Sequence, residues 1–216
     1  TSGSGATLAK AFLNAGFGGL VMCAKPEERE LWEQYARETG RLQHLVIFSP
    51  TGYAYNEHGQ KIEKQWRFNF LNYELKRLGK GGGLTENLVN LLTRITELAE
   101  GTHDLAGKEQ FWERAMRQLI RNGIEILSLS QGGISLKDLA KLIRDAPVSQ
   151  EQLEKDKKWW DESFCAKCIL QAEQKEKTPR EQNDFEMAWD YWLREYPNLG
   201  DRTRSGIVAT FTSVAD

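Results

Sequence analysis

The chain has 216 residues, of which 40% are hydrophobic and 28% charged, and this composition excludes an integral membrane protein, a collagen-like fibre and a fully disordered tail. Its 29 basic residues are balanced by 31 acidic ones, so only a local patch is expected to contact nucleic acid. Three cysteines make no disulfide framework, which favours a reducing compartment.

The first part of the sequence alternates between helical and strand-like patterns. Residues 6–13 place apolar side chains on one helical face, and residues 26–40 predict a second helix that begins at a proline and ends at a glycine. The runs 20–24 and 44–48 are continuously apolar, as in strands that are buried on both faces of a parallel sheet. The order helix, strand, helix, strand predicts an α/β layer with a parallel sheet.

The sequence pattern of the rest of the chain changes at a run of glycines, from loop and strand patterns before it to helical patterns after it. Residues 51–65 predict a loop or a loose hairpin, and 66–70 predict a short edge strand because apolar and polar residues alternate there. Gly81, Gly82 and Gly83 follow no strand and form the clearest break in the chain. Beyond them the sequence predicts helices almost throughout, with a linker at 101–107.

Two groups of side chains allow a functional and a structural interpretation. Cys165 and Cys168 form a CxxC motif, but a structural zinc site needs four ligands and no second pair accompanies them, which favours packing within a helix over zinc. Trp159 and Trp160 follow three lysines, as in an aromatic and basic contact with nucleic acid. Nearby acidic residues cancel that charge, and burial in a helix bundle is the favoured interpretation.

The opening residues also have two interpretations. A phosphate-binding loop ends in G-K-[ST] and runs directly into a helix, whose N–H groups hold the phosphates. Thr1 stands where the hydroxyl residue of that motif would stand if the chain had been cut just after the lysine. The alternative is that residues 1–5 are a cloning linker, because Ser-Gly-Ser-Gly is common in such linkers.

Several phrases occur in a fixed order along nearly the whole chain. They are AGFGGLVMCAKPEE at 15–28, FNFLNYE at 68–74, GLTENLVNLL at 83–92, FW at 111–112 with LI at 119–120, and RSGIVAT at 204–210. Together they resemble the motor domain of the coupling ATPases of type IV secretion and conjugation, which belong to the FtsK/HerA class of P-loop DNA translocases.

The resemblance implies a partial P-loop NTPase with a RecA-like parallel sheet. Its parts would be a nucleotide-binding α/β layer at 1–83, an all-α insertion at 84–200 and a helix at 201–216 that returns to the nucleotide-binding domain. ATP and magnesium would be the cofactors, with the Thr1 hydroxyl on the metal and with Ser2 and Gly3 at the helix start beneath the phosphates. Arg67 matches an arginine that serves the nucleotide of a neighbouring subunit, and Lys64 lies close to it.

The resemblance also implies partners and a location. The intact protein would form a hexameric ring, bind DNA, contact components of a type IV secretion channel and take a relaxase or an effector as its substrate. It would lie at the cytoplasmic face of the bacterial inner membrane. We expect this chain itself to be soluble, because the apolar run 20–24 is far shorter than the roughly 20 residues of a spanning helix.

The sequence departs from the family at its most diagnostic motifs. It contains neither G-x-x-x-x-G-K nor a Walker B strand, an apolar run that ends in Asp-Glu. Without the lysine and the acidic pair, the charge on the transferring phosphoryl group is not neutralised, so we predict that the polypeptide as written does not hydrolyse ATP. Two alternatives are a non-enzymatic adaptor, with a small α/β unit and a helical bundle, and a binding subunit that has lost its active site.

Overall fold

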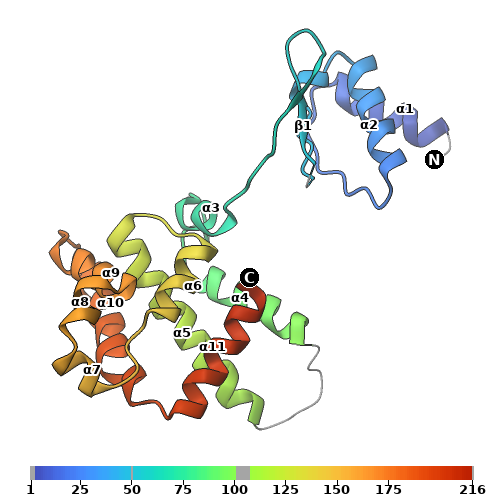
Figure 1. Ribbon diagram of the computed structural model, residues 1–216. Coiled ribbons are helices and arrows are strands. Elements are labelled where there is room, and N and C mark those ends of the chain that lie inside the picture. Colours follow the sequence, from blue (N-terminus) through green and yellow to red (C-terminus); the bar gives the residue numbers. More distant parts are fainter. Residues whose placement is uncertain (1–2, 50, 101–107, 216) are drawn as a thin grey trace. The chain divides into compact units, whose positions relative to one another are not determined.

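The computed structural model describes residues 3–49, 51–100 and 108–215, and the chain divides into two compact units, Thr1–Phe68 and Asn69–Asp216 (Figure 1). Helices dominate, and the strands of the described residues form one two-stranded antiparallel sheet. The linker expected at 101–107 lies outside the described residues. Among the helices that the structure describes, none is both long and apolar enough to cross a bilayer.

The N-terminal unit holds two helices and a small hairpin. Its elements are α1 (Gly3–Asn14), α2 (Pro26–Glu38), a 3-10 turn η1 (Leu42–His44), β1 (Tyr53–Tyr55) and β2 (Lys61–Glu63). The two predicted helices and the predicted hairpin are confirmed. Pro26 fixes the first turn of α2, where the Glu28 carboxylate accepts a hydrogen bond from the Ala24 N–H at 2.9 Å, and Gly40 ends the helix region with a positive φ of 68°.

The hairpin is held by a tight turn and a fixed register. Tyr53 pairs with Glu63, and Tyr55 with Lys61. The Asn56 carboxamide oxygen accepts hydrogen bonds from the N–H groups of His58 and Gln60, as Asx turns do. The edge strand predicted at 66–70 is wrong: the Asn69 side chain instead accepts a hydrogen bond from the Asn72 N–H and caps a helix that begins at Phe70.

The strands predicted at 20–24 and 44–48 are also wrong, and the described residues contain no parallel sheet. Neither run has a strand partner, and Leu20 and Met22 are each 88% exposed, while Phe48 is 69% exposed. A strand of a parallel sheet is stable because neighbours pair with its edges and helices cover its faces. Within the described part of the chain neither run finds such neighbours. Run 20–24 keeps its large apolar side chains in solvent, whereas 44–48 buries Ile47 in the small N-terminal core and leaves Val46 and Phe48 exposed.

The second unit, called here the helical unit, is a bundle of short helices around one long one. Its α-helices are α3 (Phe70–Lys76), α4 (Thr85–Glu100), α5 (Lys108–Gln131), α6 (Leu136–Arg144), α7 (Gln150–Lys155), α8 (Lys157–Glu162), α9 (Phe164–Gln174), α10 (Pro179–Asp190) and α11 (Asp201–Ala215). A π-helical turn η2 (Tyr191–Glu195) and a 3-10 turn η3 (Tyr196–Asn198) join α10 to α11.

Helix α5 is the centre of the helical unit. It packs against α4, α6, α9, α10 and α11 (Figure 1). The apolar side chains on its inward face are buried. Gly123 lets α6 approach, because a Cβ there would lie 2.5 Å from Leu139 Cδ1. Helix α11 belongs to the same core, where Ile207 and Phe211 are buried.

Side-chain caps set where several of these helices begin. Ser135, which stands just before an apolar stripe, accepts a hydrogen bond from the Asp138 N–H at the start of α6. Thr178 and Glu181 form a capping box ahead of α10, with Pro179 at the first helical position. These local signals explain why the helices of this unit could be placed from the sequence.

Candidate functional site

The predicted nucleotide-binding residues lie at the start of α1. Thr1 and Ser2 are outside the described residues, and Gly3 is the first residue of α1. A Cβ placed on Gly3 would meet no atom within 4 Å, so the helix start is open. N–H groups of a first helical turn can hold an anion, but no charged side chain of that turn contributes, because the turn consists of glycine, serine and alanine.

The other end of α1 is fixed to α2 and the segment that follows it. The Lys10 ammonium lies 2.5 Å from the Glu38 carboxylate and 5.3 Å from the centre of the Tyr35 ring. The Arg41 guanidinium donates to the Leu13 carbonyl at 3.1 Å and to the Phe17 carbonyl at 2.8 Å, where a cation suits the negative end of a helix. These contacts orient α1 although none of its described side chains is buried.

A buried carboxylate joins α2 to the hairpin. Glu33 is buried and accepts hydrogen bonds from the hydroxyls of Tyr53 and Tyr55, the latter at 2.5 Å. Arg29 Nε lies 3.4 Å and Lys61 Nζ 3.8 Å from its oxygens. Burial, and then the hydrogen bond to Glu33, raises the pKa of Tyr55 to about 12, so this hydroxyl stays protonated and continues to donate.

The sequence analysis did not foresee the role of Glu33. The available signal was the i,i+4 spacing of Arg29 and Glu33 on a helix, together with two tyrosines on one face of a strand. The sequence could not show that Tyr53 and Tyr55, which follow Glu33 by 20 and 22 positions, donate to this carboxylate. Both oxygens of the Glu33 carboxylate are engaged by groups of α2 and the hairpin, so its evident role is to hold the unit together.

Arg67 lies between the hairpin and α3, in a segment without regular structure. Its side chain is exposed, with one long contact of 3.5 Å from Nη2 to Gln65 Oε1. Lys64 differs, because its ammonium lies 3.9 Å from the centre of the Trp66 ring. Of the two cations that the sequence left open, Arg67 is therefore the one whose charge faces solvent without an aromatic partner. Among the described residues, no hydrogen bond joins Arg67 to Gly3.

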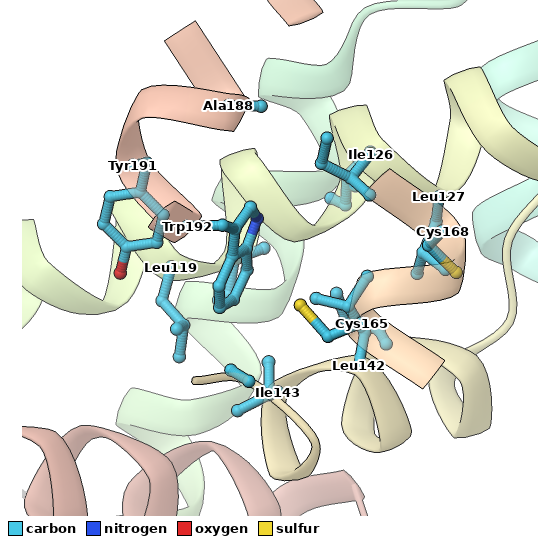
Figure 2. Packing of buried hydrophobic residues seen from close by; sticks show 14 of the residues in the cluster. Leu119, Ile126, Leu127, Leu142, Ile143, Cys165, Cys168, Ala188, Tyr191 and Trp192 are labelled. Atoms are coloured by element: carbon cyan, nitrogen blue, oxygen red, sulfur yellow. The ribbon is translucent and has the colours of Figure 1, made fainter. Parts of the chain in front are cut away.

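The CxxC pair lies inside the helical unit. Cys165 and Cys168 are both buried on α9, and Figure 2 shows them among the apolar side chains of the core. Burial raises the pKa of both thiols, which keeps them protonated, and Gln131 Nε2 lies 3.7 Å from the Cys168 sulfur. The residues that the structure describes contain no group of three or more metal-ligating side chains.

The predicted packing of the tryptophans is confirmed. The Trp159 indole is buried and donates to the Asp145 carbonyl at 3.0 Å, and the Trp160 indole donates to the Leu153 carbonyl at 2.9 Å. Trp192 is fully buried: its indole donates to the Asn122 carbonyl at 3.1 Å, and Figure 2 shows it beside Leu119 and Tyr191. A buried indole with its N–H satisfied is a core residue and offers no face for a base to stack on.

Comparison with known proteins adds no further assignment. No protein family, curated protein or solved structure matches the chain. The function must therefore be argued from the residues themselves.

Proposed function

We propose that this chain is part of a ring-forming, ATP-driven DNA translocase that feeds DNA, or a DNA–protein substrate, into a type IV secretion or conjugation channel. The observation that carries the proposal is the pair of apolar runs, 20–24 and 44–48, on either side of α2, which have no strand partner among the described residues and leave Leu20, Met22 and Phe48 exposed. In this proposal residues 1–83 belong to a P-loop domain of the RecA-like kind, and residues 84–200 are its all-α insertion.

The two apolar runs, 20–24 and 44–48, have the composition and order of buried parallel strands. Leaving a large apolar side chain in water forfeits about 1.5–3 kcal/mol of burial, and Leu20, Met22 and Phe48 all do so. Parallel strands on either side of each run would recover that free energy, and α2 would then be the crossover helix between them. The phrases along the sequence that resemble the coupling ATPases support the same arrangement.

The proposed roles of the site residues follow from that resemblance. Thr1 would coordinate the magnesium ion of MgATP, and Ser2 and Gly3 would open the helix beneath the phosphates. Arg67 would act on the nucleotide of a neighbouring subunit in a hexameric ring, for which its exposed guanidinium is suited. Attachment to the cytoplasmic face of the inner membrane, the channel contacts and the relaxase or effector cargo belong to the same proposal.

One sequence determination tests the proposal directly. The native gene should encode G-x-x-x-x-G-K immediately ahead of Thr1, and an apolar strand that ends in Asp-Glu should follow after Asp216. Codons for an unrelated sequence at both places would contradict the proposal and favour the adaptor. A P-loop with no acidic strand would favour a binding subunit that has lost its activity.

A kinetic experiment tests the role of Arg67 in the protein expressed from that native gene. Arg67→Ala should lower DNA-stimulated ATP turnover at saturating ATP by about 10³-fold, the lower end of what an arginine finger contributes. Lys64→Ala is the matched control, since it removes a cation three positions away, and its turnover should stay within about 3-fold of the wild type. Equal losses in both variants would show that Arg67 has no special role.

The adaptor remains the second candidate because the helical unit has a complete core of its own. Its buried side chains come from every one of its helices except α7, among the described residues, and they form one continuous cluster. A unit of this kind can present a surface to a partner without any chemistry. Absence of nucleotide binding in the native protein, together with a partner held by the helical unit, would establish the adaptor.

A further inference from the structure

Helix α4 carries a second apolar stripe that flanks its core face. Leu84, just ahead of the helix, and Leu91 and Leu98 within it are 41%, 44% and 74% exposed. Their spacing of seven residues brings them back to the same face of the helix every two turns. The core face of α4 is formed by other residues, Leu88, Val89 and Leu92, which are fully buried. The stripe is therefore not needed to hold the helical unit together.

A groove runs beside this stripe, between α3 and α4. It encloses about 390 Å³ and is lined by Phe70, Tyr73, Glu74, Arg77, Asn87 and Leu91. Leu78, on the loop after α3, is almost fully exposed. The groove and the stripe share Leu91, and both lie within residues 70–98, called here the α3–α4 surface.

The walls of the groove are held in place by hydrogen bonds. The Arg77 guanidinium donates two hydrogen bonds to the Glu74 carboxylate, from Nε at 2.5 Å and from Nη2 at 2.8 Å. The Asn87 carboxamide joins the two elements, since it donates to Glu74 at 2.6 Å and to the Gly81 carbonyl at 2.7 Å. A groove with fixed walls loses little entropy when a ligand enters it.

The charges around the α3–α4 surface are unbalanced. Its three carboxylates are already paired with arginines: Glu74 with Arg77, Glu97 with Arg94, and Glu86 with both Arg117 and Arg121. Lys76 and Lys80 are exposed, and the described residues give neither of them an ion-pair partner. The charge left without an ion-pair partner among the described residues of this segment is thus basic, although the protein as a whole carries a net charge of −2.

We propose that the α3–α4 surface binds an acidic amphipathic helix of a partner protein. An apolar stripe that repeats every seven residues packs well against a partner helix with the same apolar repeat. Acidic side chains beside the apolar stripe of that partner would meet Lys76 and Lys80, and also Arg117 and Arg121, whose two charges share the single carboxylate of Glu86. The proposal goes beyond the proposed function and does not depend on it, because it uses only residues of the helical unit and requires no nucleotide.

A second copy of the chain fits this surface less well than an acidic helix. Two such surfaces face to face would bring Lys76 and Lys80 of one copy toward those of the other, and like charges at an interface oppose association. DNA fits less well also, because phosphates would meet the lysines but leave the leucine stripe without a partner. The charge and the apolar pattern together select the acidic helix.

The test uses a fluorescent peptide of three heptads with leucine at the first and fourth positions and glutamate at the flanking positions. Its anisotropy is measured as the 216-residue chain is added, at about 0.1 M salt so that charges beyond about 10 Å are screened. A peptide with lysine in place of each glutamate, and one with serine in place of each leucine, are the matched probes. We expect both to bind at least about 10-fold more weakly than the acidic peptide.

Variants of the chain locate the binding surface. Leu91→Gln should weaken binding of the acidic peptide by about 10-fold, and the matched control Leu170→Gln, at another partly exposed leucine on α9, should leave it within about 2-fold. The double variant Lys76→Glu and Lys80→Glu should weaken it by about 10-fold and reduce its salt dependence, whereas Lys157→Glu with Lys175→Glu should not. Unchanged circular dichroism and thermal unfolding show that each variant is folded.

Four outcomes would overturn the proposal. They are failure of the acidic peptide to bind, equal binding of the lysine peptide, equal effects of Leu91→Gln and Leu170→Gln, and a chain that is a dimer and becomes a monomer on Leu91→Gln. A fifth would assign the surface to nucleic acid: a duplex oligonucleotide that binds, is lost with the lysine double variant and is unaffected by Leu91→Gln. None of these results bears on ATP turnover, so failure here leaves the proposed function standing.

Discussion

The two units of this chain treat their apolar side chains in opposite ways. The helical unit surrounds α5 with buried leucine, isoleucine and tryptophan, while the N-terminal unit buries a small cluster around Tyr55 and leaves Leu20, Met22 and Phe48 in solvent. The helical unit is closed by hydrophobic packing, whereas the N-terminal unit is held largely by polar contacts to Glu33 and Arg41. The difference teaches that the helical unit has a large apolar core beside the exposed leucines of its α3–α4 surface, whereas the N-terminal unit has only a small core and leaves much of its apolar surface uncovered.

The largest expected difference between the units is in the reactivity of their cysteines. Cys23 is exposed in the N-terminal unit, while Cys165 and Cys168 are buried with a raised pKa. Iodoacetamide should therefore modify Cys23 at least about 100-fold faster than the other two, which must wait for the helical unit to open. Mass spectrometry of timed samples measures this. Three equal rates would show that the helical unit is not closed, and faster labelling of the pair with a chelator would indicate bound zinc.

Two tryptophan-to-alanine substitutions compare how much each core contributes to the free energy of unfolding. Trp192→Ala should cost about 3–5 kcal/mol of unfolding free energy, because the indole is fully buried and bonded to Asn122. Trp32→Ala, at a half-buried indole against Tyr35 in the N-terminal unit, should cost only about 1–2 kcal/mol. Urea unfolding followed by circular dichroism gives both values, and a Trp32 cost equal to that of Trp192 would contradict the difference between the units.

The smallest expected effect concerns the alkaline stability of the hairpin. The ordinary pKa of tyrosine is 10.0, and Tyr55 is raised to about 12, so its hydrogen bond to Glu33 stabilises the folded state fully below pH 10. This contribution is lost as the pH rises through about 12, because the unfolded chain releases its proton first. In a spectrophotometric titration, Tyr55→Phe should remove one tyrosine that ionises late. Loss of a tyrosine that ionises near pH 10 would contradict the buried cluster.

The helices were predictable because their signals are local. The capping box at Thr178 and the serine cap at Ser135 lie within one turn of the helices they start, and apolar stripes repeat at helical spacing. The runs 20–24 and 44–48 were mistaken for strands in a sheet because an apolar run shows a tendency to be buried and not whether neighbours exist to bury it.

The contacts that were missed join residues far apart in the sequence. Glu33 receives its hydrogen bonds from the hairpin, and Gly123 is required by the approach of Leu139 from another helix. Neither requirement leaves a pattern within a short window of sequence. The predicted nucleotide residues at the start of α1 stay a prediction, because their assignment depends on resemblance and not on packing.

Hydrogen exchange of the whole chain, measured by mass spectrometry, tests the contrast between the units most directly. The account predicts that amides of α5 and α9 exchange only by global opening of the helical unit, while amides at 18–23 and 46–49 exchange at nearly the rate of an unstructured peptide. Protection of 18–23 equal to that of α5 would contradict the account, because it would show that this run is already paired as a strand.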